Sequence, residues 1–138
     1  MPSVKKTAAP AEPAAKAASK APATKPAAKF RLRITVGDVI AIGPGKIQLL
    51  EAIGETGSIT SAAKSLDMSY RRAWLLLDEL NHALRKPAVD SAKGGQNGGG
   101  SLVTDTGRQL IELYRGVEAT AALACKPELT RLIGLLAR

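Results

Sequence analysis

The sequence predicts a mainly α-helical fold with a small β-hairpin, a winged helix-turn-helix, preceded by a disordered basic tail. Two short helical segments follow one another between residues 57 and 84, and a glycine-rich stretch between two candidate strands comes next. Two helices joined by a tight turn are what a helix-turn-helix requires. We expect a tail at residues 1–29, the winged domain at residues 30–125 and a short amphipathic helix, a candidate dimer contact, at residues 126–138.

Residues 1–29 have the composition of a disordered tail. They hold eleven alanines, six lysines and five prolines, and Glu12 is their only acidic residue. Such side chains bury too little apolar surface to offset the entropy of ordering, and the prolines interrupt any alanine helix. A targeting peptide is the alternative, because such peptides are also basic and poor in acids. The tail has no arginine, however, and its prolines disrupt an amphipathic helix.

The bulk composition limits the possible classes of protein. The chain has 138 residues, a formal charge of +8 and one cysteine, which fits one small domain with a tail. No apolar run reaches the roughly 18 residues of a membrane span, so we expect a soluble cytoplasmic protein with no membrane partner. The single cysteine excludes an internal disulfide and a multi-cysteine zinc site.

Residues 30–57 predict a strand, a turn and a helix. Apolar and polar residues alternate from residue 30 to residue 36, the period of a half-buried strand. Gly37 and Asp38 predict a turn, and residues 39–42 a second extended piece. Pro44 is tolerated as a first helical residue. The helix that it opens is expected to end at residues 54–57 and to bury Ile47, Leu50 and Ile53.

Residues 58–84 predict the helix pair. Ser58 and Ser69 each precede a helical apolar pattern and are suited to cap it by accepting a hydrogen bond from a free backbone N–H. The small side chains of Ala62 and Ala63 let a neighbouring helix cross closely. We expect the second helix to pack inward through Trp74 and its leucines. Its apolar residues at helical spacing are Tyr70, Ala73, Trp74, Leu77, Leu80 and Leu84.

Residues 87–138 predict a hairpin and two more helices. Candidate strands at residues 87–91 and 102–104 flank the glycine-rich stretch, and Thr104 or Asp105 is expected to cap the helix that follows. Lys126 and Pro127 are expected to end that helix. Its apolar side consists of Leu110, Ile111, Tyr114, Val117 and Ala121, and that of the final segment of Leu129, Leu132, Ile133 and Leu136.

The polar face of the second helix of the pair indicates a nucleic-acid surface. Arg71 and Arg72 stand at its N-terminal end, Leu75 follows, and the acidic Asp78 and Glu79 come later. A recognition helix enters the major groove with its N-terminal residues leading, where positive charge meets phosphates and guanine edges. A solvated charged face is the alternative for any single helix, but the preceding helix and the hairpin favour DNA.

The glycine-rich stretch indicates a wing more than a nucleotide site. Gly94, Gly99 and Ser101 resemble part of a phosphate-binding loop, but residue 100 is glycine where that loop has lysine, and a strand follows instead of a helix. In a wing, Lys93, Gln96 and Asn97 reach phosphate or the minor groove; a hairpin tip without a role is the alternative. No catalytic set is evident, so we expect no enzyme activity, no cofactor and no metal.

Several segments resemble a known family. In order along the chain they are GSITSAAK, MSYRRAW, the glycine-rich stretch and LVTDTGRQLIELYR. Together they resemble the N-terminal DNA-binding domain of the ModE-type, molybdate-responsive transcription regulators, related to the LysR-type winged helix, over roughly residues 31–120. The resemblance implies a bacterial or archaeal cytoplasmic regulator that binds a palindromic DNA site as a homodimer.

The chain also departs from that family. It stops soon after the dimerising helix and lacks the family's oxyanion-binding segment, so no molybdate binding is expected from this chain alone. Arg72 stands where the family usually has a small residue, and Leu75 where an acid is common. Both changes make the DNA-facing surface more positive. Ser91 and Gln96 replace basic residues of the wing.

The sequence therefore predicts a sequence-specific, double-stranded DNA-binding transcriptional regulator of the bacterial nucleoid, acting as a homodimer. One alternative is an architectural nucleoid protein whose basic tail, similar to linker-histone tails, adds salt-sensitive affinity. An oxyanion sensor and a partner-binding module built on the last helix are further alternatives. The residues predicted to contact DNA are Ser58, Ser61, Lys64, Ser69, Tyr70, Arg71, Arg72, Leu75, Lys93, Gly94, Gln96 and Asn97.

Overall fold

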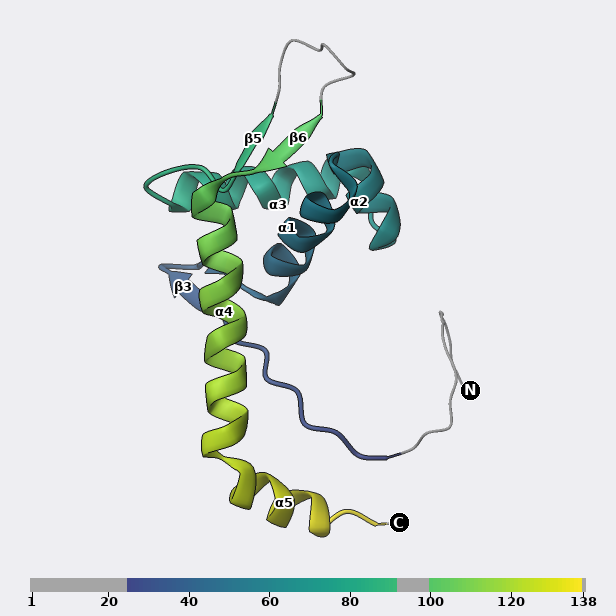
Figure 1. Ribbon diagram of the computed structural model, residues 1–138, viewed down its shortest axis with the longest axis vertical. Coiled ribbons are helices and arrows are strands. Elements are labelled where there is room, and N and C mark those ends of the chain that lie inside the picture. Colours follow the sequence, from purple (N-terminus) through teal and green to yellow (C-terminus); the bar gives the residue numbers. More distant parts are fainter. Residues whose placement is uncertain (1–24, 92–99, 138) are drawn as a thin grey trace. The chain divides into compact units, whose positions relative to one another are not determined.

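A computed structural model describes residues 25–91 and 100–137 of the chain (Figure 1). Phe30–Pro127 form one unit, and the chain ends on either side of it form another. The elements, in order, are β3 (Ile34–Val36), β4 (Val39–Ile42), α1 (Pro44–Thr56), α2 (Ile59–Ser65), α3 (Tyr70–Ala83), β5 (Val89–Ser91), β6 (Ser101–Val103), α4 (Asp105–Ala124) and α5 (Lys126–Gly134). Three helices, a hairpin and a further helix follow in the predicted order, so the winged helix-turn-helix is confirmed.

The core of Phe30–Pro127 is centred on α1. This helix is buried on the predicted face, and α2 and α3 meet it through small and branched side chains. Each fully buried leucine or isoleucine stabilises the fold by about 2 kcal/mol. Tyr114 of α4 is also buried in this core. The buried core residues of the three helices are Ile47, Leu49, Leu50, Ala52, Ile53, Ala62, Ala63, Ala73, Leu77 and Leu80.

Three side-chain caps begin three of the helices, as predicted. The hydroxyl oxygen of Ser58 accepts a hydrogen bond from the backbone N–H of Ser61 at 3.0 Å. The Ser69 hydroxyl caps α3 in the same way (3.0 Å), and the Thr104 hydroxyl caps α4 (3.1 Å). Each cap satisfies a backbone donor that the helix leaves free, a contribution of about 1 kcal/mol. The sequence therefore encodes the starts of α2, α3 and α4 locally.

Two antiparallel hairpins flank the helical core. In the first, β3 and β4 join through the predicted turn, where Gly37 has a φ of +62° that favours glycine. In the second, β5 pairs with β6 in the register Val89–Val103. The glycine-rich segment that joins β5 to β6, residues 92–99, lies outside the described residues. The predicted wing thus has its two strands in place.

Helix α4 is attached to α1 and to the chain before β3. Arg115 donates to both carboxylate oxygens of Glu51, at 2.9 and 2.7 Å, and a third time to Glu118. The hydrogen bonds from Arg115 hold the pKa of Glu51 below its ordinary value, although partial burial opposes the shift. The Tyr114 hydroxyl donates to the carbonyl of Leu32 at 2.7 Å. These bonds fix the N-terminal half of α4.

The prediction of a half-buried strand over residues 30–36 is wrong in two respects. Only Ile34–Val36 are in a strand, and all three side chains are exposed. The alternating pattern shows which side chains share a face, but in the described part of the chain neither face of β3 is covered enough to bury its side chains. Leu32, just before the strand, does pack against the core.

The expected inward position of Trp74 is also wrong. Tyr70 is 54% exposed and Trp74 is 47% exposed, whereas Ala73 beside them is fully buried. Residues along a helix are rotated by about 100° from one to the next. The buried stripe is narrower than predicted, and Trp74 lies at its edge. Leu76, which was not assigned to the apolar face, packs against the core instead.

The last two helices are largely exposed. Val117 of the predicted apolar side of α4 is 49% exposed, because the core reaches only the first half of this helix. Helix α5 forms where the amphipathic pattern predicts it, and none of its residues is buried. In the described part of the chain, no helix has both the length and the hydropathy that a membrane crossing requires.

Replacement of Gly107 by alanine tests the packing of α4 on β6 and on Ala88, the residue before β5. A Cβ there overlaps the Ala88 carbonyl oxygen and lies 2.7 Å from a methyl carbon of Val103. We expect the G107A variant to lose about 1–3 kcal/mol of unfolding free energy, measured by urea denaturation. Gly116 of the same helix has open space around it, so the G116A control should gain stability through helix propensity. A G107A variant as stable as G116A would contradict this packing.

The Glu51–Arg115 pair predicts a pH-dependent contribution to stability. Because folding lowers the pKa of Glu51, the contribution is fully present above pH 4.5, the ordinary pKa of glutamate, and is lost as the pH falls through the lowered value. We expect the E51Q variant to lose about 1 kcal/mol at neutral pH, a figure reduced for solvent screening. Urea titrations from neutral pH to about pH 3 measure the difference. A loss that is independent of pH, or an equal loss in an E55Q control, would contradict it.

Candidate nucleic-acid interface

The rotation of α3 about its own axis determines which of its residues point outward. Ala73, Leu77 and Leu80 are buried against the core. On a helix of 3.6 residues per turn, the side opposite this stripe carries Arg71, Leu75 and His82. All three are exposed. The outer face therefore begins with a guanidinium and an apolar side chain near the N-terminus of the helix.

The N-terminal turn of α3 is cationic and open to solvent. Ser69, Tyr70, Arg71 and Arg72 are all exposed, as the sequence predicts. The Ser69 hydroxyl oxygen already accepts the capping bond from Arg72 N–H, so its own proton remains available for donation. The first turn of a helix also has free N–H groups and the positive end of the helix dipole. Together these groups favour an anionic partner at this end of α3.

Helix α2 carries the predicted backbone-contacting residues. Ser61 and Lys64 are exposed. Ser58 is partly buried, and its hydroxyl oxygen accepts the capping bond of α2, so its role in the structure is to begin the helix. The turn to α3 is tight: Asp67 has a φ of +58°, and Met68 N–H bonds the Ala63 carbonyl at 3.0 Å. α2 and α3 form the expected helix-turn-helix.

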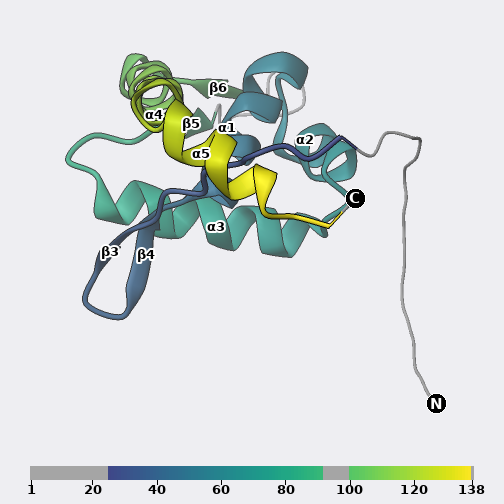
Figure 2. The ribbon, with the colours of Figure 1, turned by 90° about the horizontal axis from the view of Figure 1, so that it is seen from below.

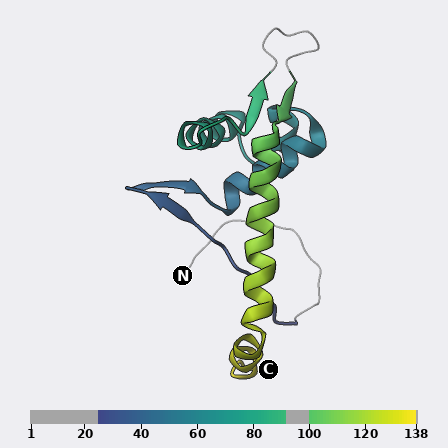
Figure 3. The ribbon, with the colours of Figure 1, turned by 60° about the vertical axis from the view of Figure 1, so that its left-hand side comes forward.

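One flank of α3 faces the β5–β6 hairpin. The side-chain oxygen of Asn81 accepts a bond from Ala88 N–H at 2.8 Å, and its amide nitrogen lies 3.4 Å from the Val89 carbonyl oxygen. The hairpin is thereby held beside α3 (Figure 3). Trp74 and Tyr70 lie on the same flank as Asn81, closer to the N-terminus of the helix. The predicted wing residues Lys93, Gly94, Gln96 and Asn97 lie outside the described residues.

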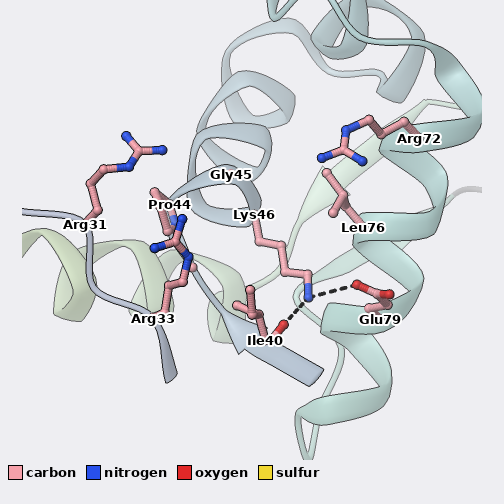
Figure 4. Close-up of a pocket in the computed structure, with 10 residues that line it drawn as sticks. Arg31, Arg33, Ile40, Pro44, Gly45, Lys46, Arg72, Leu76 and Glu79 are labelled. Carbon is pink, nitrogen blue, oxygen red and sulfur yellow. Dashed lines mark hydrogen bonds and ion pairs between the residues drawn. The ribbon is translucent and has the colours of Figure 1, made fainter. Parts of the chain in front are cut away.

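The other flank of α3 faces the β3–β4 hairpin (Figure 2). Lys46 of α1 is only 4% exposed. Its ammonium group donates to the Ile40 carbonyl oxygen of β4 and lies 3.1 Å from a carboxylate oxygen of Glu79 (Figure 4). One buried charge thus connects the hairpin, α1 and α3. Glu79, which the sequence places on the polar face of α3, is a structural partner of this lysine.

The burial of Lys46 and its pairing with Glu79 were not predicted, because no local sequence pattern indicates them. A lysine in a helical segment ordinarily lies in solvent, because burying an unpaired ammonium is costly. Its partners stand on β4, close to it in sequence, and on α3, more than thirty residues away. Among the described residues there is no group of three or more histidine, cysteine, aspartate or glutamate side chains that could hold a metal ion.

The predicted DNA-contacting residues of the described part are distributed over two consecutive helices. Six of them are exposed beside the turn or on the outer face of α3, and these are Ser61, Lys64, Ser69, Tyr70, Arg71 and Arg72. Leu75 continues this face at 44% exposure. This part of the surface combines cations, hydroxyls and the apolar side chain of Leu75, so it offers hydrogen-bond donors and a methyl contact.

Comparison with known proteins finds similarity to molybdenum-related proteins. Over 96 residues, 70% of this chain, it is 41% identical to the molybdenum transport protein ModE of Azotobacter vinelandii. It is 42% identical over 81 residues, 59% of this chain, to the molybdenum-pterin-binding protein MopB of Rhodobacter capsulatus. The DNA-binding transcriptional dual regulator ModE of Escherichia coli is 36% identical over 87 residues, 63% of this chain.

These similarities cover part of each relative. The chain spans only 35%, 30% and 33% of the three proteins, respectively. No family model matches the chain. Among solved structures, it is similar to the full-length LysR-type regulator LysG of Corynebacterium glutamicum with bound arginine, with a TM-score of 0.49 and 20% identity over 66% of this chain and 29% of that one. Over the residues compared, the chain is a homologue of the ModE-type regulators, as its sequence motifs predict.

Proposed function

We propose that the domain formed by Phe30–Pro127 binds double-stranded DNA through α3 and that the protein regulates transcription. The observation that carries this proposal is the exposed, cationic N-terminal half of α3, presented outward by the burial of Ala73, Leu77 and Leu80. A groove-reading helix needs such a combination of rigid support and free donors. The Escherichia coli relative is itself described as a DNA-binding transcriptional regulator, which supports the assignment.

Each proposed contact follows from the chemistry of the side chain. Arg71, on the outer face, has the guanidinium fork that pairs with the O6 and N7 acceptors of guanine. Leu75, one turn further on the same face, suits a thymine methyl group. Ser69 and Arg72, at the edge of the face, suit phosphate oxygens. The remaining proposed contacts are Ser58, Ser61 and Lys64 on the DNA backbone, Tyr70 at the groove, and Lys93, Gly94, Gln96 and Asn97 in the wing.

We further propose that the protein acts as a homodimer through α4. The middle of this helix exposes apolar side chains, with Leu113 at 61% and Val117 at 49% exposure. These residues line a shallow hollow of about 460 Å³ with Gly116, Thr120, Ala121 and Ala124. In a dimer, the leucine and valine side chains of a second copy of α4 would pack against these small residues. Pairing of the two α4 helices would relate the two domains by a two-fold axis, and a dimer of this symmetry suits a palindromic DNA site.

The domain boundaries are part of the same proposal. Residues 1–29 act as a basic extension that adds sequence-independent affinity for DNA, residues 30–125 form the DNA-binding domain, and residues 126–138 extend the dimer contact. Six lysines against one glutamate in the first segment support an electrostatic role.

A selection experiment tests the proposed function. The full chain is used to enrich bound duplexes from a randomised pool, and the affinities for an enriched and a scrambled duplex are then measured at several salt concentrations. A specific regulator should prefer the enriched duplex by a factor of about 10³ or more. A ratio near one would favour an architectural role, and no binding to either duplex would overturn the proposal.

The R71A variant tests the role of α3 at the groove. We expect it to lose about 1–3 kcal/mol of binding free energy on the enriched duplex and much less on the scrambled one, because a base contact is lost. The R85A variant removes an exposed guanidinium from the loop between α3 and β5, where no contact is proposed, and should leave the ratio of affinities unchanged. Equal losses on both duplexes would remove Arg71 from base recognition.

A further inference from the structure

A pocket of about 280 Å³ lies between the β3–β4 hairpin, the start of α1 and α3 (Figure 4). Its charged lining residues are Arg31, Arg33, Lys46, Arg72 and Glu79. Lys46 and Glu79 are paired with each other. Three guanidinium groups therefore remain without an internal counter-charge, and the contacts proposed above assign no role to two of them.

The anchoring of Leu32 in the core places the side chains of Arg31 and Arg33 on the same face of the chain. The Leu32 side chain packs against the core and its carbonyl oxygen accepts the hydrogen bond from the Tyr114 hydroxyl. In an extended chain, residues two apart project to the same face. The two arginines therefore flank an anchored residue and lie over the first residues of α1, as Figure 4 shows. The rest of the fold thus determines where they stand.

The three guanidiniums are suited to bind phosphate. Within the described residues none of them takes part in an ion pair, and Arg31, Arg33 and Arg72 are all exposed. The three positive charges at one pocket repel one another, and a bound anion would replace this repulsion with attraction. The planar fork of arginine pairs with two phosphate oxygens at once. α1 also begins at this pocket, with Gly43 as a cap that provides no side-chain acceptor, so its positive dipole end adds to the potential.

We propose that Arg31, Arg33 and Arg72 form a second contact for the phosphodiester backbone of DNA, on the β3–β4 side of α3. This inference rests on the proposed function. A helix in the major groove, about 12 Å wide, has a phosphate strand on each of its two sides. The β5–β6 hairpin lies beside one flank of α3 (Figure 3), and the arginine pocket lies on the other flank, towards the β3–β4 hairpin (Figure 4). The hairpin would therefore contact one DNA strand that borders the groove, and the arginine pocket would contact the other.

The exposure of the arginines favours a phosphodiester over a small free anion. A small oxyanion in water is held by several buried donors that replace its hydration shell, and here the donors stand at the open edge of the pocket. A strand of DNA brings successive phosphates to an open cationic edge from outside. It also releases condensed counterions on binding, which a small anion does not.

The R31A/R33A double variant tests the proposal through the salt dependence of DNA binding. Each lost phosphate contact should make the slope of log K against log salt shallower by about 0.9. We expect the double variant to lose about one to two units of slope equally on enriched and scrambled duplexes, with an unchanged ratio of affinities. The R85A/K86A double variant removes two exposed cations of the loop between α3 and β5, to which no contact is assigned, and should keep more of the slope. An unchanged slope in R31A/R33A overturns the proposal.

A footprint of the wild-type protein gives a test that needs no variant. Hydroxyl-radical cleavage of a bound duplex should show protection on both strands that border the contacted groove, and R31A/R33A should lose the protection on one of them. Protection of a single strand by the wild-type chain overturns the proposal. Melting curves of both proteins confirm that the exposed substitutions leave the fold intact.

Titration with inorganic phosphate separates the two sources of anion. The wild-type chain without DNA is titrated with phosphate against chloride at constant ionic strength. Phosphate binding that R31A/R33A abolishes, combined with an unchanged slope on DNA, assigns the pocket to a free anion and overturns the phosphodiester contact. If the wild-type chain binds no duplex, the proposed function fails; if it binds and only the slope prediction fails, the pocket alone has been wrongly assigned.

Discussion

The packing of α3 on α1 through Ala73, Leu77 and Leu80 is the constraint on which the rest of the structure depends. These residues are at most 5% exposed, so turning α3 by even one residue, about 100°, would expose a leucine and bury Arg72 in one direction or Asn81 in the other. The small side chain of Ala73 brings the two helices close together and leaves little freedom of rotation. Every statement about which residues α3 presents to a partner follows from this stripe.

The two flanks of α3 are held by polar groups of different kinds. Asn81 bonds the backbone at the start of β5, and Glu79 reaches Lys46, which also bonds β4. Both hairpins are thus positioned relative to the same helix from its C-terminal half. The N-terminal half, with Arg71 and Leu75, is left free of such bonds and open to a partner. Of the two acidic residues of α3, Glu79 pairs with Lys46 of α1, whereas Asp78 lies 3.4 Å from His82 of the same helix.

Local features could be predicted from the sequence, and features that depend on distant neighbours could not. The caps at Ser58, Ser69 and Thr104 and the turn at Gly37 depend only on adjacent residues, and all four are confirmed. The burial of Trp74 was predicted wrongly because periodicity shows the centre of an apolar stripe but not its width. The pairing of Lys46 depends on Glu79, far along the chain, and no pattern of spacing indicates it. Arg31 and Arg33 were visible in the alternating segment, but their proximity to Arg72 required the fold.

Trp74 provides the most direct test of the orientation of α3 on DNA. It is the only tryptophan in the chain, it is 47% exposed, and it lies on the β5-facing flank of the half of α3 proposed to enter the groove. Acrylamide quenching of its fluorescence is measured with and without a saturating enriched duplex, with saturation established by anisotropy of the labelled DNA. The account predicts a clear drop in the quenching constant when DNA binds, because the groove covers this flank. A quenching constant that stays unchanged at full saturation would contradict it.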